Sequence, residues 1–283
     1  MRRRVWEERF FQGVMLLSVA AIVGALVVIV GVITAKGIRS LNWAMVTQVP
    51  HGGYYLGKSG GVLNAILGSL ALAAGATLLA GLCAFPVCLY LQHDYAGRSK
   101  LASVVRTSLD LLWGIPSIVY GAFGFTVLLY LGVRASLLGG IIALALVELP
   151  IMARAMEESV RMVSQELKDA SYAMGGTRWE TMRKVVLRQS LPGVLTGVLL
   201  AFGRGIGDAA SVLFTAGYTD SLPRGLLEPV ASLPLAVFFQ IGSPVPEVRA
   251  RAYAAAFILL AIVLLVSLVS RLIGARMSRY CVR

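Results

Sequence analysis

Residues 157–189, EESVRMVSQELKDASYAMGGTRWETMRKVVLRQ, form a polar segment between two long apolar runs. Ser164 is placed to cap a first short helix of this segment. Gly175 and Gly176 follow about three turns later and are suited to end that helix, because glycine enters the left-handed conformation without a steric penalty. The pattern predicts a short helix that stops at a tight turn.

A second helix is expected to begin at Thr177. Glu180 stands three residues further on, so the two side chains can satisfy each other's free backbone N–H groups in a capping box. Both helices carry an apolar stripe, formed by Leu167, Ala170 and Met174 in the first and by Trp179, Met182 and Val186 in the second. Such an amphipathic pair needs a covering surface, either the lipid interface or another protein.

The composition indicates a membrane protein. Hydrophobic residues make up 58% of the 283 residues and charged residues 14%, whereas a soluble domain has about 25% charged residues. The apolar runs are continuous, and each is long enough for a helical span of about 20 residues. We therefore expect an all-α integral membrane domain over residues 1–283, with six spans at 12–35, 63–91, 108–131, 137–156, 191–216 and 252–273.

The distribution of positive charge predicts the orientation of the chain. With the N-terminus inside, the inner segments hold eighteen of the 26 Lys and Arg residues and the outer segments hold seven. The positive-inside rule then places both termini and residues 157–190 in the cytoplasm. Nucleic-acid binding, the rival explanation of a net charge of +12, is disfavoured because the basic residues are not interleaved with aromatic residues on one face.

The sequence contains few motifs that are typical of enzymes or metal sites. Residues 52–59, GGYYLGKS, match the phosphate-binding pattern G-x4-G-K-[ST]. That loop requires a preceding strand and a following helix N-terminus, and the charge distribution places this match outside the cell. With two histidines and no H-E-x-x-H or C-x-x-C pattern, we expect no catalytic residue, no metal site and no cofactor.

Ionisable residues within or near the spans are the candidates for a substrate path. Arg204 and Asp208 are four residues apart and are expected to be neighbours on one helix face. An arginine at the bilayer centre costs at least about 2.5–3.5 kcal/mol and usually faces the bundle interior or a water-filled path. Arg204 is thus either a structural partner of Asp208 or an anion contact. Arg154 either reaches the inner headgroups or lines the path, and Asp110 and Glu148 are secondary candidates.

Proline and glycine residues indicate where a helix bends and where two helices pack closely against each other. Pro116 interrupts the hydrogen-bond ladder of the third apolar run and is expected to kink it. Gly203 and Gly207 are four residues apart, as are Gly193 and Gly197. Small residues at this spacing allow a neighbouring helix to come close.

The polar segment also resembles a known element, the EAA loop of ABC importer permeases, which docks into the ATPase subunits. Matching positions are Asp169, Ala170, Ser171, Gly175, Val185 and Leu187. Asp169 and Ser171 replace the usual Glu and Ala, and Arg188 stands where proline is usual. The resemblance implies that the docking contacts come from Asp169, Ala170, Ser171, Gly175 and Trp179.

A more specific similarity, to the phosphate permeases of the PstA family, extends over about residues 60–265. Its most specific part is the Gly-Arg-x-x-Gly-acid sequence at residues 203–208. Asp208 departs from the family pattern, which has glutamate, and so shortens the reach of that carboxylate by one methylene. The three candidates for the substrate path, Arg204, Asp208 and Arg154, lie within this region.

The resemblance implies a six-helix permease of the type I ABC importer class (the MetI-like fold) in a bacterial inner membrane. Its expected partners are a second, PstC-like permease, two ATP-binding subunits that hydrolyse the ATP, an extracytoplasmic phosphate-binding protein, and membrane lipid. Alternatives are a permease for molybdate, tungstate or sulfate, a stand-alone secondary transporter and a membrane enzyme. A secondary transporter often contains two repeated halves, which this sequence lacks.

Overall fold

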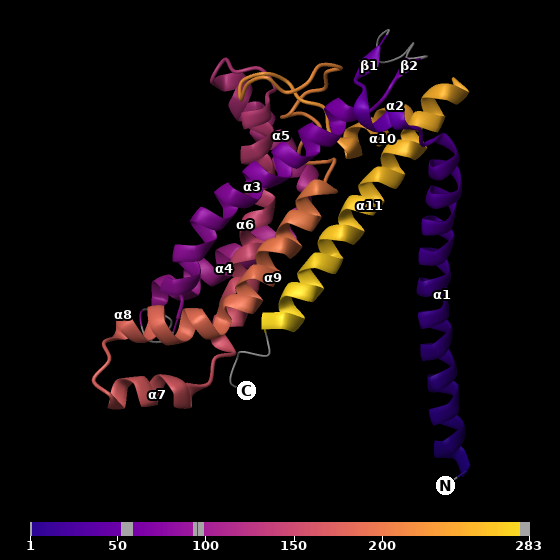
Figure 1. The fold of residues 1–283 in the computed structure, drawn as a ribbon. Coiled ribbons are helices and arrows are strands. Elements are labelled where there is room, and N and C mark those ends of the chain that lie inside the picture. Colours follow the sequence, from indigo (N-terminus) through magenta and orange to yellow (C-terminus); the bar gives the residue numbers. More distant parts are fainter. Residues whose placement is uncertain (1, 52–58, 93–94, 96–98, 278–283) are drawn as a thin grey trace.

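A computed structural model describes residues 2–51, 59–92, 95 and 99–277 as a bundle of helices (Figure 1). The phosphate-loop pattern at 52–59 lies outside the described residues except for Ser59. The elements are α1 (Arg2–Ser40), α2 (Trp43–Thr47), β1 (Pro50–His51), β2 (Ser59–Gly60), α3 (Leu63–Tyr90), α4 (Lys100–Gly114), α5 (Ser117–Tyr130), α6 (Leu137–Arg161), α7 (Gln165–Ala173), α8 (Arg178–Glu180), the π-helix η1 (Thr181–Val186), α9 (Leu187–Ile206), α10 (Leu233–Gln240) and α11 (Pro246–Met277).

The expected all-α membrane fold is confirmed. In the described part of the chain, five helices are long and apolar enough to cross a membrane, and a sixth span results if the bent pair of α4 and α5 counts as one. The start of α1, the end of α11 and the pair α7–α8 lie at one end of the bundle, which we call the inner end (Figure 1). The short antiparallel pair β1–β2 lies with α2 and α10 at the opposite, outer end.

The third span differs from the single kinked helix predicted for residues 108–131. It consists of two helices, α4 and α5, that meet at an angle of 100°. Pro116 disfavours a helical conformation in the residue before it, and Ile115 is accordingly extended, with φ −75° and ψ 128°. The hydroxyl of Tyr120 donates a hydrogen bond of 2.7 Å to the carbonyl of Leu112 across this corner. Pro116 therefore breaks the span and does not merely kink it.

The fifth span ends earlier than predicted, since α9 ends at Ile206 and does not continue to residue 216. The carboxylate of Asp208 accepts hydrogen bonds from the backbone N–H groups of Ala210, at 2.8 Å, and Ser211, at 3.3 Å. An aspartate that binds the backbone two or three residues ahead favours a turn over a continuing helix. Beyond this turn the chain remains irregular until α10 begins.

The irregular segment at residues 207–232 closes the outer end of the bundle. The first N–H groups of a helix have no partner within that helix, and here this segment supplies partners for α6. The N–H of Leu137 donates to the carbonyl of Glu228 over 2.8 Å. The N–H of Leu138 donates in the same way to Leu226, also over 2.8 Å.

Glycines allow α6 and α9 to pack closely, as predicted for one of the two glycine pairs. A Cβ atom at Gly193 would meet the side chain of Ser159 at 2.5 Å, and one at Gly197 would meet the Cβ of Ala155 at 2.9 Å. The prediction for the other pair is wrong. At Gly203 such an atom would have only an ordinary contact of 3.7 Å with α11, and at Gly207 it would meet only the backbone of α9 itself. The end of α9 approaches α6 through a third glycine, which is described below.

We expect close packing around α3 to be sensitive to single methyl groups. A Cβ at Gly68 would overlap the backbone carbonyl of Ala231 and lie 2.6 Å from the side chain of Val230. On the same helix, a Cβ at Gly81 would only touch the sulfur of Met152 at 3.5 Å. Gly68→Ala should therefore destabilise the protein by about 1–3 kcal/mol, as overpacking does. Gly81→Ala should be neutral or stabilising by up to about 1 kcal/mol.

Thermal unfolding of the two purified variants in detergent tests this expectation. Equal unfolding temperatures for both variants would contradict the packing described for α3.

Candidate functional site

Arg204 lies exposed in the last turn of α9. Among the described residues, its guanidinium has neither a hydrogen bond nor an ion pair. The expectation that Arg204 and Asp208 are neighbours on one helix face is wrong, because α9 ends between them and the Asp208 carboxylate binds the backbone of the following turn. The structure therefore does not support the interpretation that Arg204 is a structural ion-pair partner of Asp208.

Glu148 lies against the same end of α9. This residue stands in the middle of α6 and not at a helix end, and it is fully buried. Its Oε2 atom accepts a hydrogen bond of 2.8 Å from the hydroxyl of Thr77 on α3. A Cβ atom at Gly205 would overlap the Oε1 atom of Glu148. Gly205, which was not among the glycines predicted to allow close packing, thus lets α9 pass over a buried carboxyl group.

The structure separates Arg154 from Arg204 and Asp208. Because Glu148 of α6 contacts Gly205, and Ala155 of α6 contacts Gly197, the two helices run in opposite directions. Arg154 is six residues closer to the inner end than Glu148, which corresponds to about 9 Å along a helix axis. In the described part of the chain, no hydrogen bond or ion pair joins Arg154 to Arg204 or Asp208.

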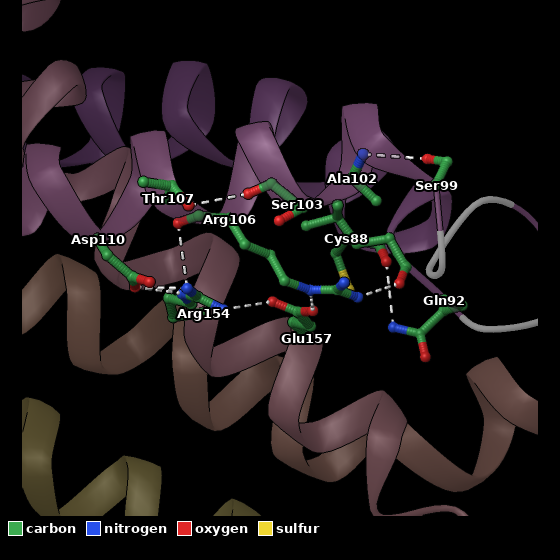
Figure 2. A network of polar contacts seen from close by, with 11 residues as sticks. Cys88, Gln92, Ser99, Ala102, Ser103, Arg106, Thr107, Asp110, Arg154 and Glu157 are labelled. Carbon is green, nitrogen blue, oxygen red and sulfur yellow. Dashed lines mark hydrogen bonds and ion pairs between the residues drawn. The ribbon is translucent and has the colours of Figure 1, made fainter.

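Arg154 instead belongs to a polar network at the inner end of the bundle (Figure 2). Its guanidinium donates to Asp110 Oδ1 over 2.9 Å and to Glu157 Oε2 over 3.0 Å. A third hydrogen bond, of 3.1 Å, reaches the backbone carbonyl of Arg106. Arg154 is therefore held by protein groups, which argues against the interpretation that it reaches freely to lipid headgroups.

Glu157 is the centre of this network. Its second oxygen, Oε1, accepts a hydrogen bond of 2.7 Å from Arg106 of α4, and Arg106 also donates to the carbonyl of Leu91, just after α3, over 2.6 Å. The Glu157 side chain is only 11% exposed, compared with 31% for Arg106 and 24% for Arg154. One carboxylate thus joins two arginines and fastens α3 and α4 to α6.

Arg106 and Glu157 were not among the predicted site residues. Glu157 stands three residues after Arg154, a spacing that places two side chains together on a helix, so half of the network was open to prediction. Arg106 comes from a distant part of the chain, and its place depends on the 100° corner between α4 and α5.

A cavity of about 830 Å³ opens beside the network, between the ends of α3, α4 and α6 and the start of α7. Its charged lining consists of the cations Arg106, Arg154, Arg161 and Lys168 and the acids Glu157 and Glu158. Cations outnumber acids in this set, so the cavity suits water and small anions.

The polar segment folds as the predicted helix–turn–helix. The hydroxyl of Thr177 accepts from the N–H of Glu180 at 3.2 Å, and the Glu180 carboxylate accepts from the N–H of Thr177 at 3.1 Å, which confirms the capping box. Gly175 has a φ of +83° and ends α7 as predicted. Ser164 occupies the cap position of α7, but its side chain makes no capping hydrogen bond, so its predicted role is wrong.

The exposed surface of this helix pair holds four of the five expected docking residues, namely Asp169, Ala170, Gly175 and Trp179. The fifth, Ser171, has its hydroxyl 2.8 Å from that of Thr181 and ties α7 to η1.

The two predicted apolar stripes are not continuous in the structure. Met182 and Val186 are buried against the bundle, whereas Met174 is 89% and Trp179 55% exposed. The exposed members, with Ala170, form an apolar surface that the chain itself leaves uncovered, which we call the loop surface.

Comparison with known proteins places these features in context. Residues 91–279 match the family model described as the inner membrane component of binding-protein-dependent transport systems. The chain is 32% identical over 278 residues to the phosphate transport system permease protein PstA of Yersinia pestis, an alignment that covers 97% of this chain and 93% of the relative. It is 30% identical over 276 residues to PstA 2 of Mycobacterium tuberculosis, with 96% and 89% of the two chains covered.

A solved structure supports the same architecture. A chain of the MetNI methionine ABC transporter, in an inward-facing conformation, matches with a TM-score of 0.62 and 20% sequence identity over 78% of this chain and 96% of that chain. At this identity the likeness concerns the fold alone. With the family match over most of its length, the chain belongs to the inner membrane components of binding-protein-dependent transport systems and is a multi-pass membrane protein with the fold of an ABC importer permease.

Proposed function

We propose that this chain is the permease subunit of an ATP-driven phosphate importer and forms the translocation path together with a second permease. The observation that carries the proposal is its similarity, over nearly its full length, to proteins named phosphate transport system permease. An exposed guanidinium without a partner among the described residues, at the end of a span, supports an anionic substrate. Permeases of this family are membrane subunits without enzymatic activity, and ATP is hydrolysed on separate subunits.

In this proposal Arg204 contacts the substrate. A planar guanidinium can donate two parallel hydrogen bonds to two oxygens of one tetrahedral oxyanion, which a lysine cannot do. Asp208 shapes the turn that ends α9 and so keeps Arg204 in the last helical turn. Arg154, beside the inner cavity, offers a second cationic position on the way to the cytoplasm.

The partners follow from the family. An ABC importer permease works in a complex with another permease subunit and ATP-binding subunits. We propose more specifically a PstC-like second permease, two ATP-binding subunits of which one covers the loop surface, and an extracytoplasmic phosphate-binding protein at the outer end. The complex would lie in the bacterial inner membrane with both termini of this chain in the cytoplasm.

Arg204→Lys should abolish or greatly reduce phosphate uptake while the complex still assembles. The loss should be about 10-fold or more, because a hydrogen bond to a charged group contributes about 1.5–3 kcal/mol. Uptake of radiolabelled phosphate into vesicles with matched protein levels measures this effect. Arg271→Lys is the control, since Arg271 is an exposed arginine on α11. Near-normal uptake by Arg204→Lys would leave Arg204 without a role in transport.

The same vesicles distinguish phosphate from its rivals. Molybdate, tungstate and sulfate are also tetrahedral oxyanions, so Arg204 alone does not discriminate among them. We expect unlabelled phosphate to suppress the uptake of labelled phosphate, and the other three anions to do so poorly. Preferential transport of one of these anions would replace the proposed substrate.

Gly175→Val should weaken the binding of the ATP-binding subunit, because a left-handed conformation is unfavourable for a β-branched residue. Gly132→Val is a matched control. Gly132 has a φ of +68°, and a Cβ atom would meet nothing within 4 Å at either glycine. It lies between α5 and α6 at the opposite end of the bundle (Figure 1). Co-purification of the ATP-binding subunit measures the outcome, and equal recovery with both variants would exclude a docking role for this turn.

The orientation can be tested with single cysteines in a chain whose Cys83, Cys88 and Cys281 are replaced by serine. Ser221 is exposed at the outer end, and Arg276 is exposed in the last turn of α11. In intact cells, an impermeant thiol reagent should label Ser221→Cys but should label Arg276→Cys only after the membrane is permeabilised. The reverse pattern would invert the proposed topology.

A further inference from the structure

The carboxyl group of Glu148 is a buried polar group at the centre of the bundle that the proposed path does not yet use. The residue is 0% exposed. Thr77 donates a hydrogen bond of 2.8 Å to its Oε2 atom, whereas the Oε1 atom is buried and has no hydrogen-bond partner in the described part of the chain. This unpartnered oxygen lies against Gly205, the residue that follows Arg204 on α9.

The groups that face Glu148 provide no positive charge. From α3 the facing group is the Thr77 hydroxyl, and from α9 it is the backbone of Gly205. The turn after α9 contributes Asp208, which is close enough to interact electrostatically with Glu148.

The cations closest to Glu148 along α6 and along α9 are bound to other groups or exposed. Arg154, further along α6, is bound to Asp110 and Glu157. Arg204 is exposed, and no ion pair between it and Glu148 is formed among the described residues.

We propose that Glu148 is a positioning residue that works as the neutral acid, and that the loss of its proton disables the substrate path at Arg204. An ionised carboxylate in an apolar interior requires a cation or several hydrogen-bond donors, and Glu148 has one hydroxyl. A charge there would add to that of Asp208, attract the guanidinium of Arg204 toward the bundle and repel an anionic substrate. The neutral acid leaves Arg204 available. This inference rests on the proposed function of phosphate import.

The test uses the whole transporter, with both permeases, the ATP-binding subunits and the phosphate-binding protein, reconstituted in liposomes. Uptake of radiolabelled inorganic phosphate is measured from about pH 6 to 9, the range in which buried glutamic acids lose their protons. Glu148→Gln and Glu148→Met carry permanently neutral side chains of similar size. Glu8→Gln, at an exposed position on α1 away from the proposed path, is the control.

The measured quantity is the ratio of variant to parent uptake at each pH, which cancels the pH dependence of phosphate itself and of the partners. For the two Glu148 variants this ratio should rise several-fold from the acidic to the alkaline end, because only the parent acquires the buried charge. For Glu8→Gln the ratio should stay constant.

Two results would overturn the inference. A ratio for Glu148→Gln and Glu148→Met that does not change with pH would reduce Glu148 to a purely structural group. Failure of both variants to assemble would show that a permanently neutral side chain cannot replace Glu148. If the parent transports another oxyanion and not phosphate, the proposed substrate fails, and the same ratios measured with the transported anion decide the role of Glu148.

Discussion

The structure depends on the close approach of α3, α6 and α9. Lipid is as apolar as the side chains of these helices, so association in a membrane relies on tight packing and interhelical hydrogen bonds and not on the exclusion of water. Gly193 and Gly197 allow α9 to contact Ser159 and Ala155 of α6 directly. The positions of the charged groups follow from this contact, because it fixes which residues of the two antiparallel helices stand level with each other.

Close packing also determines which polar groups have partners. Glu157 meets two arginines because α4 lies against the inner end of α6, and each of its oxygens accepts a short hydrogen bond. Glu148 is enclosed between α3 and α9, where a single hydroxyl reaches it. Two glutamates of one helix therefore have opposite surroundings. One is a satisfied bridge between cations, and the other is an isolated acid beside the proposed substrate contact.

Local signals in the sequence predicted local structure well. The capping box at Thr177 and the glycine turn at Gly175 involve residues within one or two turns of each other, and both were correct. The end of α9 was not predicted, because hydrophobicity continues beyond Gly207 and the decisive hydrogen bonds of Asp208 form within a turn that the composition does not reveal.

Contacts between distant parts of the chain could not be predicted from the sequence. The network at Arg154 needs Arg106, whose position depends on how sharply the chain turns at Pro116. A proline predicts an interruption but not an angle. The exposure of Trp179 was likewise hidden, since its spacing from Met182 and Val186 fits a common face and only the packed bundle separates them. Periodicity identifies an apolar stripe, but the neighbouring elements decide how much of it remains uncovered.

The order of residues along α6 and α9 connects the loop surface to the proposed path. From the outer to the inner end, α6 carries Glu148, Arg154 and Glu157 and is followed directly by α7. α9 continues the second helix of the loop without a break and ends at Arg204 and its flanking glycines. A partner that tilts the helix pair would therefore move both helices, and their contact at Gly205 would convert that tilt into a change around Glu148 and Arg204. Packed helices tend to shift between discrete arrangements, so a shift that begins at the loop would pass the contacts at Gly193 and Gly197 before it reaches the buried carboxyl.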